Sequence, residues 1–204
     1  MYIPRHFKED DVAALWDFME ANSFGMLVTN HDSGPFVSHL PFLLDRERGP
    51  SGTLSVHVAK ANPHAEDALA GAGMLAVLHG PHAYISPAWY AEPRNVPTWN
   101  YVAVHAYGKP RVITDPARLM QMLRRMIATF DQQWQLPPEA DWAERMLNGI
   151  VGFDIEIERL EGKFKLNQNR TAADRRGVIE ALSQSTDPAV LAIARYMRER
   201  ESGA

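Results

Sequence analysis

One segment late in the chain, residues 151–158, constrains the fold most, because its side chains alternate strictly between two kinds. Val151, Phe153, Ile155 and Ile157 are apolar, and a glycine or an acidic residue follows each of them. Successive side chains of a strand point to opposite faces, so this pattern is typical of a strand with one buried face. It is the cleanest strand signal in the sequence.

Further segments have strand character and are separated by turn-forming clusters such as NHDSG at 30–34. Pro41 interrupts one of them, which indicates an edge or a bulge, because proline cannot donate a ladder hydrogen bond. A second break is expected at Gly108-Lys109-Pro110. The predicted strands are 24–29, 36–44, 53–58, 74–78, 83–86, 99–107 and 109–113.

Helices are expected where a capping residue stands before a proline or where apolar residues recur at helical spacing. Such starts occur at Asn62-Pro63, Asp115-Pro116 and Asp187-Pro188. The predicted helices are 8–22, a short one from 62 to about 70, one from 115, one at 139–148 and one from 187 to about 200. About seven strands with an early helix and late helices predict a mainly β, α+β fold, a small antiparallel barrel with peripheral helices. We expect one domain over 1–204, with a helical insert at about 115–148 and C-terminal helices at about 171–200.

Composition narrows the class of protein. The 204 residues are enough for one domain, although two small domains would also fit, and 46% of them are hydrophobic. No window approaches the roughly 20 apolar residues of a membrane span, so no membrane partner is expected. The absence of cysteine excludes disulfide and thiolate chemistry, and a cytoplasmic location is the simplest expectation. A net charge of −4 argues against a nucleic-acid-binding surface, so direct DNA binding is doubtful.

An aromatic run at 84–108 has the composition of a binding site. It holds Trp89, Trp99 and four of the six tyrosines, next to small polar side chains. Flat aromatic surface beside hydrogen-bonding groups is what a planar ligand with a polar edge requires. The alternative is a tryptophan-rich core whose polar atoms satisfy the sheet. The polar candidates are Ser86, Thr98 and Asn100.

Two further segments could hold an anion. HVAKANPH at 57–64 passes from a strand to a helix, and Lys60 beside a helix start capped by Asn62 is a possible phosphate site. The alternative is that Asn62 only caps the helix and Lys60 is solvated.

The other segment, at 162–176, holds five basic residues together with the amides of Gln168 and Asn169. Such a segment can grip an anion or a ring edge, although a solvated loop is the usual outcome. The basic residues are Lys163, Lys165, Arg170, Arg175 and Arg176.

No catalytic or metal-binding motif is present. The eight histidines form no HExxH pair, and GxSxG, P-loop and GxGxxG sequences are missing. We therefore name no catalytic residue and expect no dedicated metal site.

Seven segments together resemble the PaiB-type family of FMN-binding negative transcriptional regulators. They are MYIPRHF, SHLPFLL, HVAKANPH, GPHAYISPAWY, VPTWNYVAVHAYG, IVGFDIEIERLEGKFKLNQNR and DRRGVIEAL, and they run from residue 1 to the final helix. The family usually has KLSQN where this chain has Asn167 at the serine position. The resemblance implies an FMN-binding split barrel, similar to pyridoxamine-phosphate-oxidase-like proteins, and a homodimer with flavin sites at the subunit interface.

The resemblance also implies roles for individual residues. Lys60 and Asn62 become candidates for the FMN phosphate, with His57 close by. Ser86, Thr98, Trp99 and Asn100 would line the ring and the ribityl chain. Lys165, Gln168 and Asn169 would reach in from the C-terminal segment, from the same or the partner subunit.

Three functions compete at this point. The first is a regulatory flavin-binding homodimer. The second is an FMN-dependent oxidoreductase of the flavin reductase, oxidase or haem-degrading type, in which the flavin would carry the redox chemistry. The third is a binding module without flavin.

Overall fold

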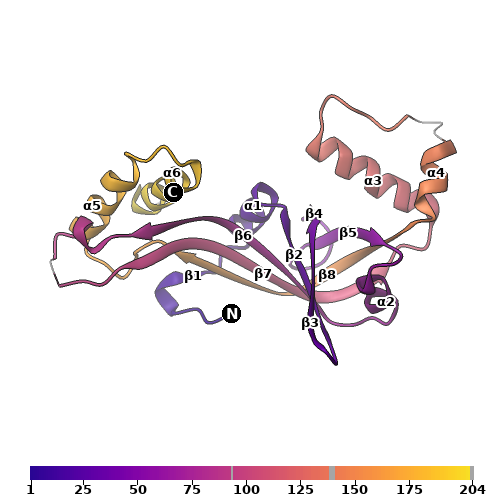
Figure 1. Cartoon of the computed structure of the whole chain (residues 1–204), viewed down its shortest axis with the longest axis horizontal. Coiled ribbons are helices and arrows are strands. Elements are labelled where there is room, and N and C mark those ends of the chain that lie inside the picture. The colour runs from indigo at the N-terminus through magenta and orange to yellow at the C-terminus, as the bar shows by residue number, and fades with distance from the viewer. Residues whose placement is uncertain (93, 138–140, 203–204) are drawn as a thin grey trace. The chain divides into compact units, whose positions relative to one another are not determined.

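The structure, a computed structural model, describes residues 1–92, 94–137 and 141–202. Its strands belong to one mainly antiparallel sheet with the order β3-β2-β6-β7-β8-β5-β4, and β1 pairs with β8 (Figure 1). The strands are β1 (Lys8–Glu9), β2 (Phe24–His31), β3 (Gly34–Pro41), β4 (Leu43–Asp45), β5 (Thr53–Ala59), β6 (Met74–Ile85), β7 (Thr98–Val112) and β8 (Ile150–Lys165).

The helices lie outside the sheet, as the sequence predicts. They are α1 (Val12–Ala21), α2 (Pro63–Leu69), α3 (Pro116–Phe130), α4 (Asp141–Leu147), α5 (Ala172–Leu182) and α6 (Pro188–Ser202), with the short 3-10 helices η1 (Arg5–Phe7) and η2 (Pro87–Trp89). The expected caps are present, because Asn62 accepts a bond from the His64 backbone N–H and Asp115 accepts one from Ala117. No helix of the described residues is long and apolar enough to cross a membrane.

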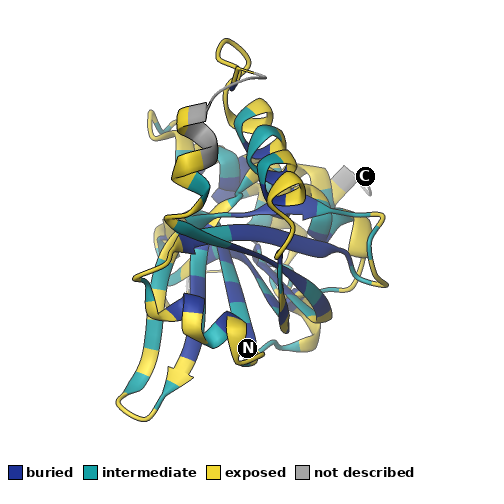
Figure 2. Ribbon diagram, turned by 90° about the vertical axis from the view of Figure 1, so that its right-hand side faces the viewer, coloured by how far each residue is buried: buried dark blue, intermediate teal, exposed yellow. Residues whose placement is uncertain are grey.

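The chain packs as two compact units. Unit 1 contains residues 1–18, 79–105 and those from 161 onward, and unit 2 contains 19–78 and 106–160. The strands β6, β7 and β8 contribute residues to both. The expectation of a single domain stays a prediction. Figure 2 shows that buried residues concentrate on the strands, whereas the helices expose one side.

The alternating segment is confirmed as a strand, and its environment in unit 2 differs from the expectation. Phe153, Ile155 and Ile157 are fully buried. The opposite face is also covered, since a Cβ on Gly152 would lie 2.4 Å from the Leu119 side chain of α3. The Asp154 carboxylate is buried too and accepts a 2.6 Å hydrogen bond from the Ser55 hydroxyl. The strand is therefore buried on two faces here, because α3 packs across it.

Two predicted strand breaks are wrong. The segments 74–78 and 83–86 form one strand, β6, and β7 runs without interruption through Gly108-Lys109-Pro110. A Cβ at Gly108 would lie 2.1 Å from the carbonyl oxygen of Glu156. The glycine therefore allows β7 to approach β8 closely, and it marks a sheet contact where the sequence indicated a turn.

The basic segment at 162–176 is also more ordered than a solvated loop. Its first residues complete β8, and its last residues begin α5, which Thr171 caps by accepting a bond from the Asp174 backbone N–H. Within unit 1, α5 packs against α6 and η2. A Cβ at Gly177 would lie 2.2 Å from the carbonyl oxygen of Trp89, so this packing requires a glycine.

Candidate functional site

In unit 1 the structure brings together three of the predicted site residues, from two separate segments. Lys165, at the end of β8, donates a hydrogen bond from Nζ to the carbonyl oxygen of Trp99 at 2.7 Å and another to Oγ1 of Thr98. Both acceptors stand at the start of β7. A lysine ammonium has three donors, so in the described part of the unit one N–H is left for a ligand oxygen.

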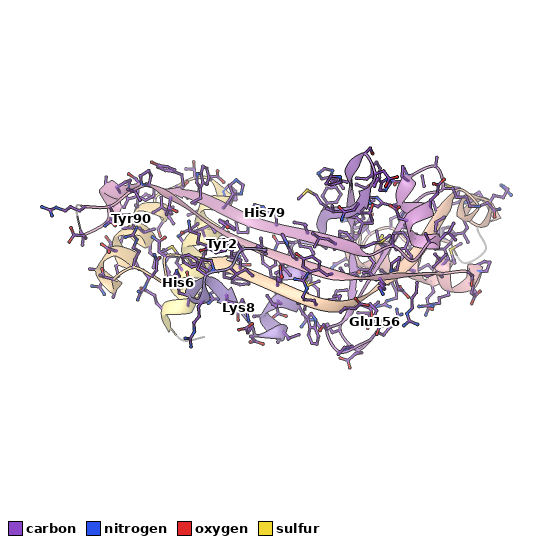
Figure 3. The ribbon with its side chains drawn as sticks, turned by 90° about the horizontal axis from the view of Figure 1, so that it is seen from below. Tyr2, His6, Lys8, His79, Tyr90 and Glu156 are labelled. Atoms are coloured by element: carbon purple, nitrogen blue, oxygen red, sulfur yellow. The ribbon has the colours of Figure 1, made fainter. Side chains whose placement is uncertain are left out.

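The neighbourhood of Lys165 is positively charged. Burial lowers the pKa of its ammonium below the usual lysine value, and the nearby charges of Lys163 and Arg170 lower it further. Lys163 itself donates to the carbonyl oxygen of Tyr2 at 3.0 Å (Tyr2 is labelled in Figure 3). Neighbouring cations repel each other, and an anion that binds between them favours their charged forms. We call Lys163, Lys165 and Arg170 the basic cluster of unit 1.

An exposed aromatic surface includes Trp99, the residue whose backbone carbonyl accepts the bond from Lys165. The Trp99 residue is 52% exposed, and Tyr84 is 47% exposed. The ring of Trp99 lies 5.8 Å from that of His82 and 5.9 Å from that of Tyr84. His79 adds a fourth ring, 5.3 Å from His82 (Figure 3 labels His79). The alternative of a tryptophan-rich core is therefore wrong for Trp99, whose indole is available to a planar ligand.

Asn100 lies elsewhere in unit 1. Its side chain is fully buried, and Nδ2 donates to the sulfur of Met197 in α6 at 3.4 Å. Its Oδ1 has no hydrogen-bond partner among the described residues. Since adjacent strand residues point to opposite faces, Asn100 does not share the exposed surface of Trp99.

The remaining unit 1 candidates mainly shape the backbone. Ser86 caps η2 by accepting a bond from the Ala88 N–H at 3.2 Å. Gln168 closes the turn after β8, because Oε1 accepts from the Leu166 N–H at 2.8 Å and Nε2 donates to the Phe164 carbonyl. Asn169 is exposed.

The structure explains why asparagine is suitable at position 167, where the family sequence KLSQN has serine. Asn167 adopts a left-handed backbone with φ 64°, a conformation that asparagine tolerates better than most residues. Its buried amide donates to the Tyr90 hydroxyl at 3.3 Å. The side chain thus fixes the turn that follows Lys165.

Unit 2 contains the other predicted phosphate residues. Asn62 uses both ends of its amide within the protein: Oδ1 caps α2 at 2.9 Å from the His64 N–H, and Nδ2 donates to Ser38 Oγ at 3.0 Å. The capping interpretation of Asn62 is confirmed. Lys60 is exposed and lines an open cavity of about 1000 Å³ that also contains Arg145 and Asn148. Arg145 is thus a second cation of the same cavity, which the sequence did not reveal.

His57 lies in a different environment from Lys60. It lines a mostly apolar cavity of about 330 Å³ under α3 and α4. Burial lowers the pKa of its imidazole, and Nδ1 has no hydrogen-bond partner in the described residues. The neutral ring is therefore the form expected at pH 7.

Comparison with known proteins identifies the family. A model of the family described as "Putative FMN-binding domain" matches residues 1–159. A Bacillus subtilis protein named Protease synthase and sporulation protein PAI 2 is 36% identical, over 98% of this chain and 98% of the relative. This chain belongs to that FMN-binding family. The PaiB-type resemblance is confirmed, and FMN is the cofactor.

Two solved structures support the fold. The flavocytochrome Anf3 of Azotobacter vinelandii has a TM-score of 0.63 at 15% identity, covering 84% of this chain and 73% of that one. A FAD and heme binding protein of Mycobacterium smegmatis has a TM-score of 0.61 at 14% identity, covering 83% and 78%. At these identities the likeness shows the fold alone, and it confirms the predicted split-barrel type.

The residues of this FMN-binding chain fit a flavin mononucleotide chemically. The basic cluster and the Lys60–Arg145 pair are suited to a phosphate or to the electron-rich edge of the ring. The exposed Trp99 indole is suited to the ring's face. Sequence reasoning missed His79, His82 and Arg145. The two histidines lie three residues apart on one strand, β6, where a motif with helical spacing such as HExxH does not apply.

Proposed function

We propose that this protein is a regulatory FMN-binding homodimer in which Lys165 holds the flavin. The observation that carries the proposal is the contact of Lys165 with Thr98 and the Trp99 backbone. These bonds fix an ammonium at the start of the strand that carries the exposed Trp99 indole, so we propose that one flavin uses both the charged donor and the flat face. When bound, the flavin would supply redox chemistry or a redox-dependent signal, and the protein would supply position and charge.

The other candidates take different roles in this proposal. Lys60, which lines the same cavity as Arg145, is the candidate phosphate contact of unit 2. Asn62, Ser86 and Gln168 shape the backbone through the hydrogen bonds described above. Asn100 is buried against Met197 and packs on the face of β7 opposite Trp99. Asn169 is exposed and is a candidate for contact with a partner subunit.

The homodimer is supported by the exposed aromatic surface. Trp99, Tyr84 and His82 lie on one face of unit 1 with their rings within 6 Å of a neighbour. Contiguous apolar surface of this kind is typical of interaction sites, and a second copy of the chain is the partner that the family resemblance implies. Sedimentation of the purified protein tests this directly: a monomer at micromolar concentration would contradict the proposal.

The regulatory role rests on the relative from B. subtilis, whose name refers to protease synthesis and sporulation. A mobility-shift assay with the protein's own upstream DNA, repeated across salt concentrations, tests direct repression. We expect no stable shift, because the net charge is −4 whereas a surface that binds DNA usually carries an excess of basic residues. Salt-sensitive binding of that DNA would establish a direct contact, whereas none at low salt would leave regulation to a partner or a metabolite. A cytoplasmic location is part of the same proposal.

Flavin binding is tested with the purified full chain. Wild type should copurify as a yellow protein or take up FMN with a saturable change in flavin absorbance. Lys165→Met should weaken uptake, whereas Lys8→Met, which removes a lysine whose side chain is 52% exposed and pairs with Asp10, should not. Equal FMN affinity of the two variants would move the site away from Lys165.

An FMN-dependent oxidoreductase is the second candidate, and His79 with His82 favours it. The His82 imidazole lies beside Trp99 and the His79 imidazole lies beside His82, and burial together with the charge of His82 lowers the pKa of His79. A histidine that is mainly neutral at pH 7 can accept and return a proton during redox chemistry. Bleaching of flavin absorbance by NADPH would support this function, and unchanged absorbance would count against a nicotinamide-driven reductase.

A further inference from the structure

The cavity that contains His57 has the dimensions of a small-molecule site. Its volume is about 330 Å³, at the lower end of the range of about 300–1,000 Å³ that is usual for ligand pockets. Its walls come from β5, α3, the segment after α3, α4 and the start of β8, all within unit 2. A cavity of this size accepts a molecule of one or two fused rings.

The lining of the cavity selects for an apolar ligand. Two tryptophans, Trp134 and Trp142, and three methionines take part in the described walls, and none of these wall residues except His57 is titratable. Indoles offer flat faces to an aromatic ring, and methionine side chains adapt to irregular shapes. A charged ligand would lose its hydration without finding a counter-ion, so an uncharged ligand is favoured.

The mouth of the cavity exposes apolar surface that a ligand would cover. Trp134 and Trp142 are each 46% exposed, and Met146 is 66% exposed. Exposed apolar side chains gathered around a cavity are typical of a binding site.

His57 supplies the one polar group. Its Nδ1 has no partner among the described residues and is itself shut off from solvent, so the ring can meet a ligand in the cavity only through Nε2. An imidazole in an apolar wall that lacks hydrogen-bond partners lowers the stability of the fold, unless a ligand or water forms the missing hydrogen bond. With the proton of the neutral ring on Nδ1, Nε2 is an acceptor, and a hydroxyl or N–H on the ligand can donate to it.

We propose that this cavity is a binding site for an uncharged aromatic molecule with one hydrogen-bonding group that pairs with His57. Its lining contains neither Lys60 nor Arg145 nor any residue of the basic cluster, although it shares Met120, Leu147 and Ile150 with the cavity that Lys60 lines. It therefore gives the protein a second ligand, of a phenol-like or indole-like class, besides FMN.

The test is equilibrium dialysis of the flavin-loaded full chain against 2-naphthol and, separately, naphthalene. These probes share the ring system and differ by the hydroxyl. Wild type should bind both saturably with one site per chain and prefer 2-naphthol. In His57→Phe the preference should fall by about fivefold, the effect of one net hydrogen bond, while naphthalene still binds.

Trp142→Ala is the second variant and should weaken the binding of both probes, because the indole is part of the wall. Since Trp142 is 46% exposed, its loss should leave the core intact. The matched control is Phe130→Ala, which removes an aromatic side chain of α3 that is 51% exposed and outside the wall, and which should bind like wild type.

Three results would overturn the proposal. The first is the absence of saturable binding by wild type, and the second is unchanged binding in both His57→Phe and Trp142→Ala. The third is release of flavin into the dialysate in proportion to the bound probe, because the cavity would then be part of the flavin site. Failure of the wild type to take up added FMN would contradict the proposed function, and the probe measurements would then be made on the flavin-free chain.

Discussion

Replacing Lys165 by methionine removes the ammonium and keeps most of the side chain's length and apolar volume. In the protein this ammonium bonds Thr98 and the Trp99 carbonyl at the start of β7. A hydrogen bond to a charged group contributes about 1.5–3 kcal/mol, and about 1.4 kcal/mol corresponds to a factor of ten in affinity. If one ammonium N–H contacts FMN, Lys165→Met should raise the FMN Kd by about 10- to 100-fold.

Fluorescence quenching of free FMN by the apoprotein measures this Kd directly. Lys165→Arg retains the charge but presents a planar fork, so it should recover only part of the affinity. Thermal unfolding of the apoproteins is the control for folding: the melting temperature of Lys165→Met should stay close to that of wild type, because both acceptors lie near the surface. An FMN Kd within twofold of wild type in Lys165→Met would refute the reasoning.

The pH dependence of FMN binding gives a second readout of the same group. Burial, with the charges of Lys163 and Arg170, lowers the pKa of Lys165. Its ammonium is fully charged well below that pKa and becomes neutral as the pH rises through it. The affinity for FMN should therefore fall at an alkaline pH lower than that of an ordinary lysine, and Lys165→Met should lack this step. An identical alkaline decline in wild type and variant would assign the step to another group.

Three substitutions test the packing around the candidate sites. Gly177→Ala places a Cβ 2.2 Å from a backbone carbonyl of η2, so it should lower the free energy of unfolding by about 1–3 kcal/mol in denaturant titrations; Gly73→Ala, with open space around its Cβ, is the matched control. Asp154→Asn removes the buried carboxylate that pairs with two arginines, Arg48 at 2.8 Å and Arg118, and it should cost about 3 kcal/mol, whereas no loss would show that the arginines find water instead. Asp67 has a lowered pKa, because hydrogen bonds from Thr29 and His31 outweigh the opposing effect of burial. Its carboxylate thus contributes stability above its unfolded-state pKa that is lost as the pH falls through the lower folded value, and melts of Asp67→Asn should lose less stability than wild type between neutral and strongly acidic pH.

Much of the fold followed from local patterns. The caps at Asn62 and Asp115 begin helices as predicted, and the alternation at 151–158 lies in β8. These features depend on neighbouring residues only, so the sequence displays them directly. The predicted breaks in β6 and β7 were wrong, and in β7 the reason is that Gly108 faces the carbonyl of Glu156, a residue remote in sequence.

The candidate site was likewise predictable in part from the sequence. Residue types marked Trp99, Lys60 and Lys165 as possible ligand contacts, and all three side chains are available for one. Asn62 and Gln168 had equally suitable chemistry, yet the backbone already uses their amides. No local pattern distinguishes an amide that binds a ligand from one that closes a turn. The difference depends on whether a nearby backbone N–H or carbonyl needs the amide as its hydrogen-bond partner.

The sequence by itself determined the class of this protein: a mainly β chain of an FMN-binding family, with an aromatic run and a basic segment suited to a flavin. The tertiary structure decided which of those residues can act. It placed the Lys165 ammonium against the start of β7, buried Asn100 behind the strand that exposes Trp99, and set His57 in an apolar cavity. The physical reason is that strand alternation and helix packing assign each side chain to one face, and the face decides whether it meets a ligand or the core.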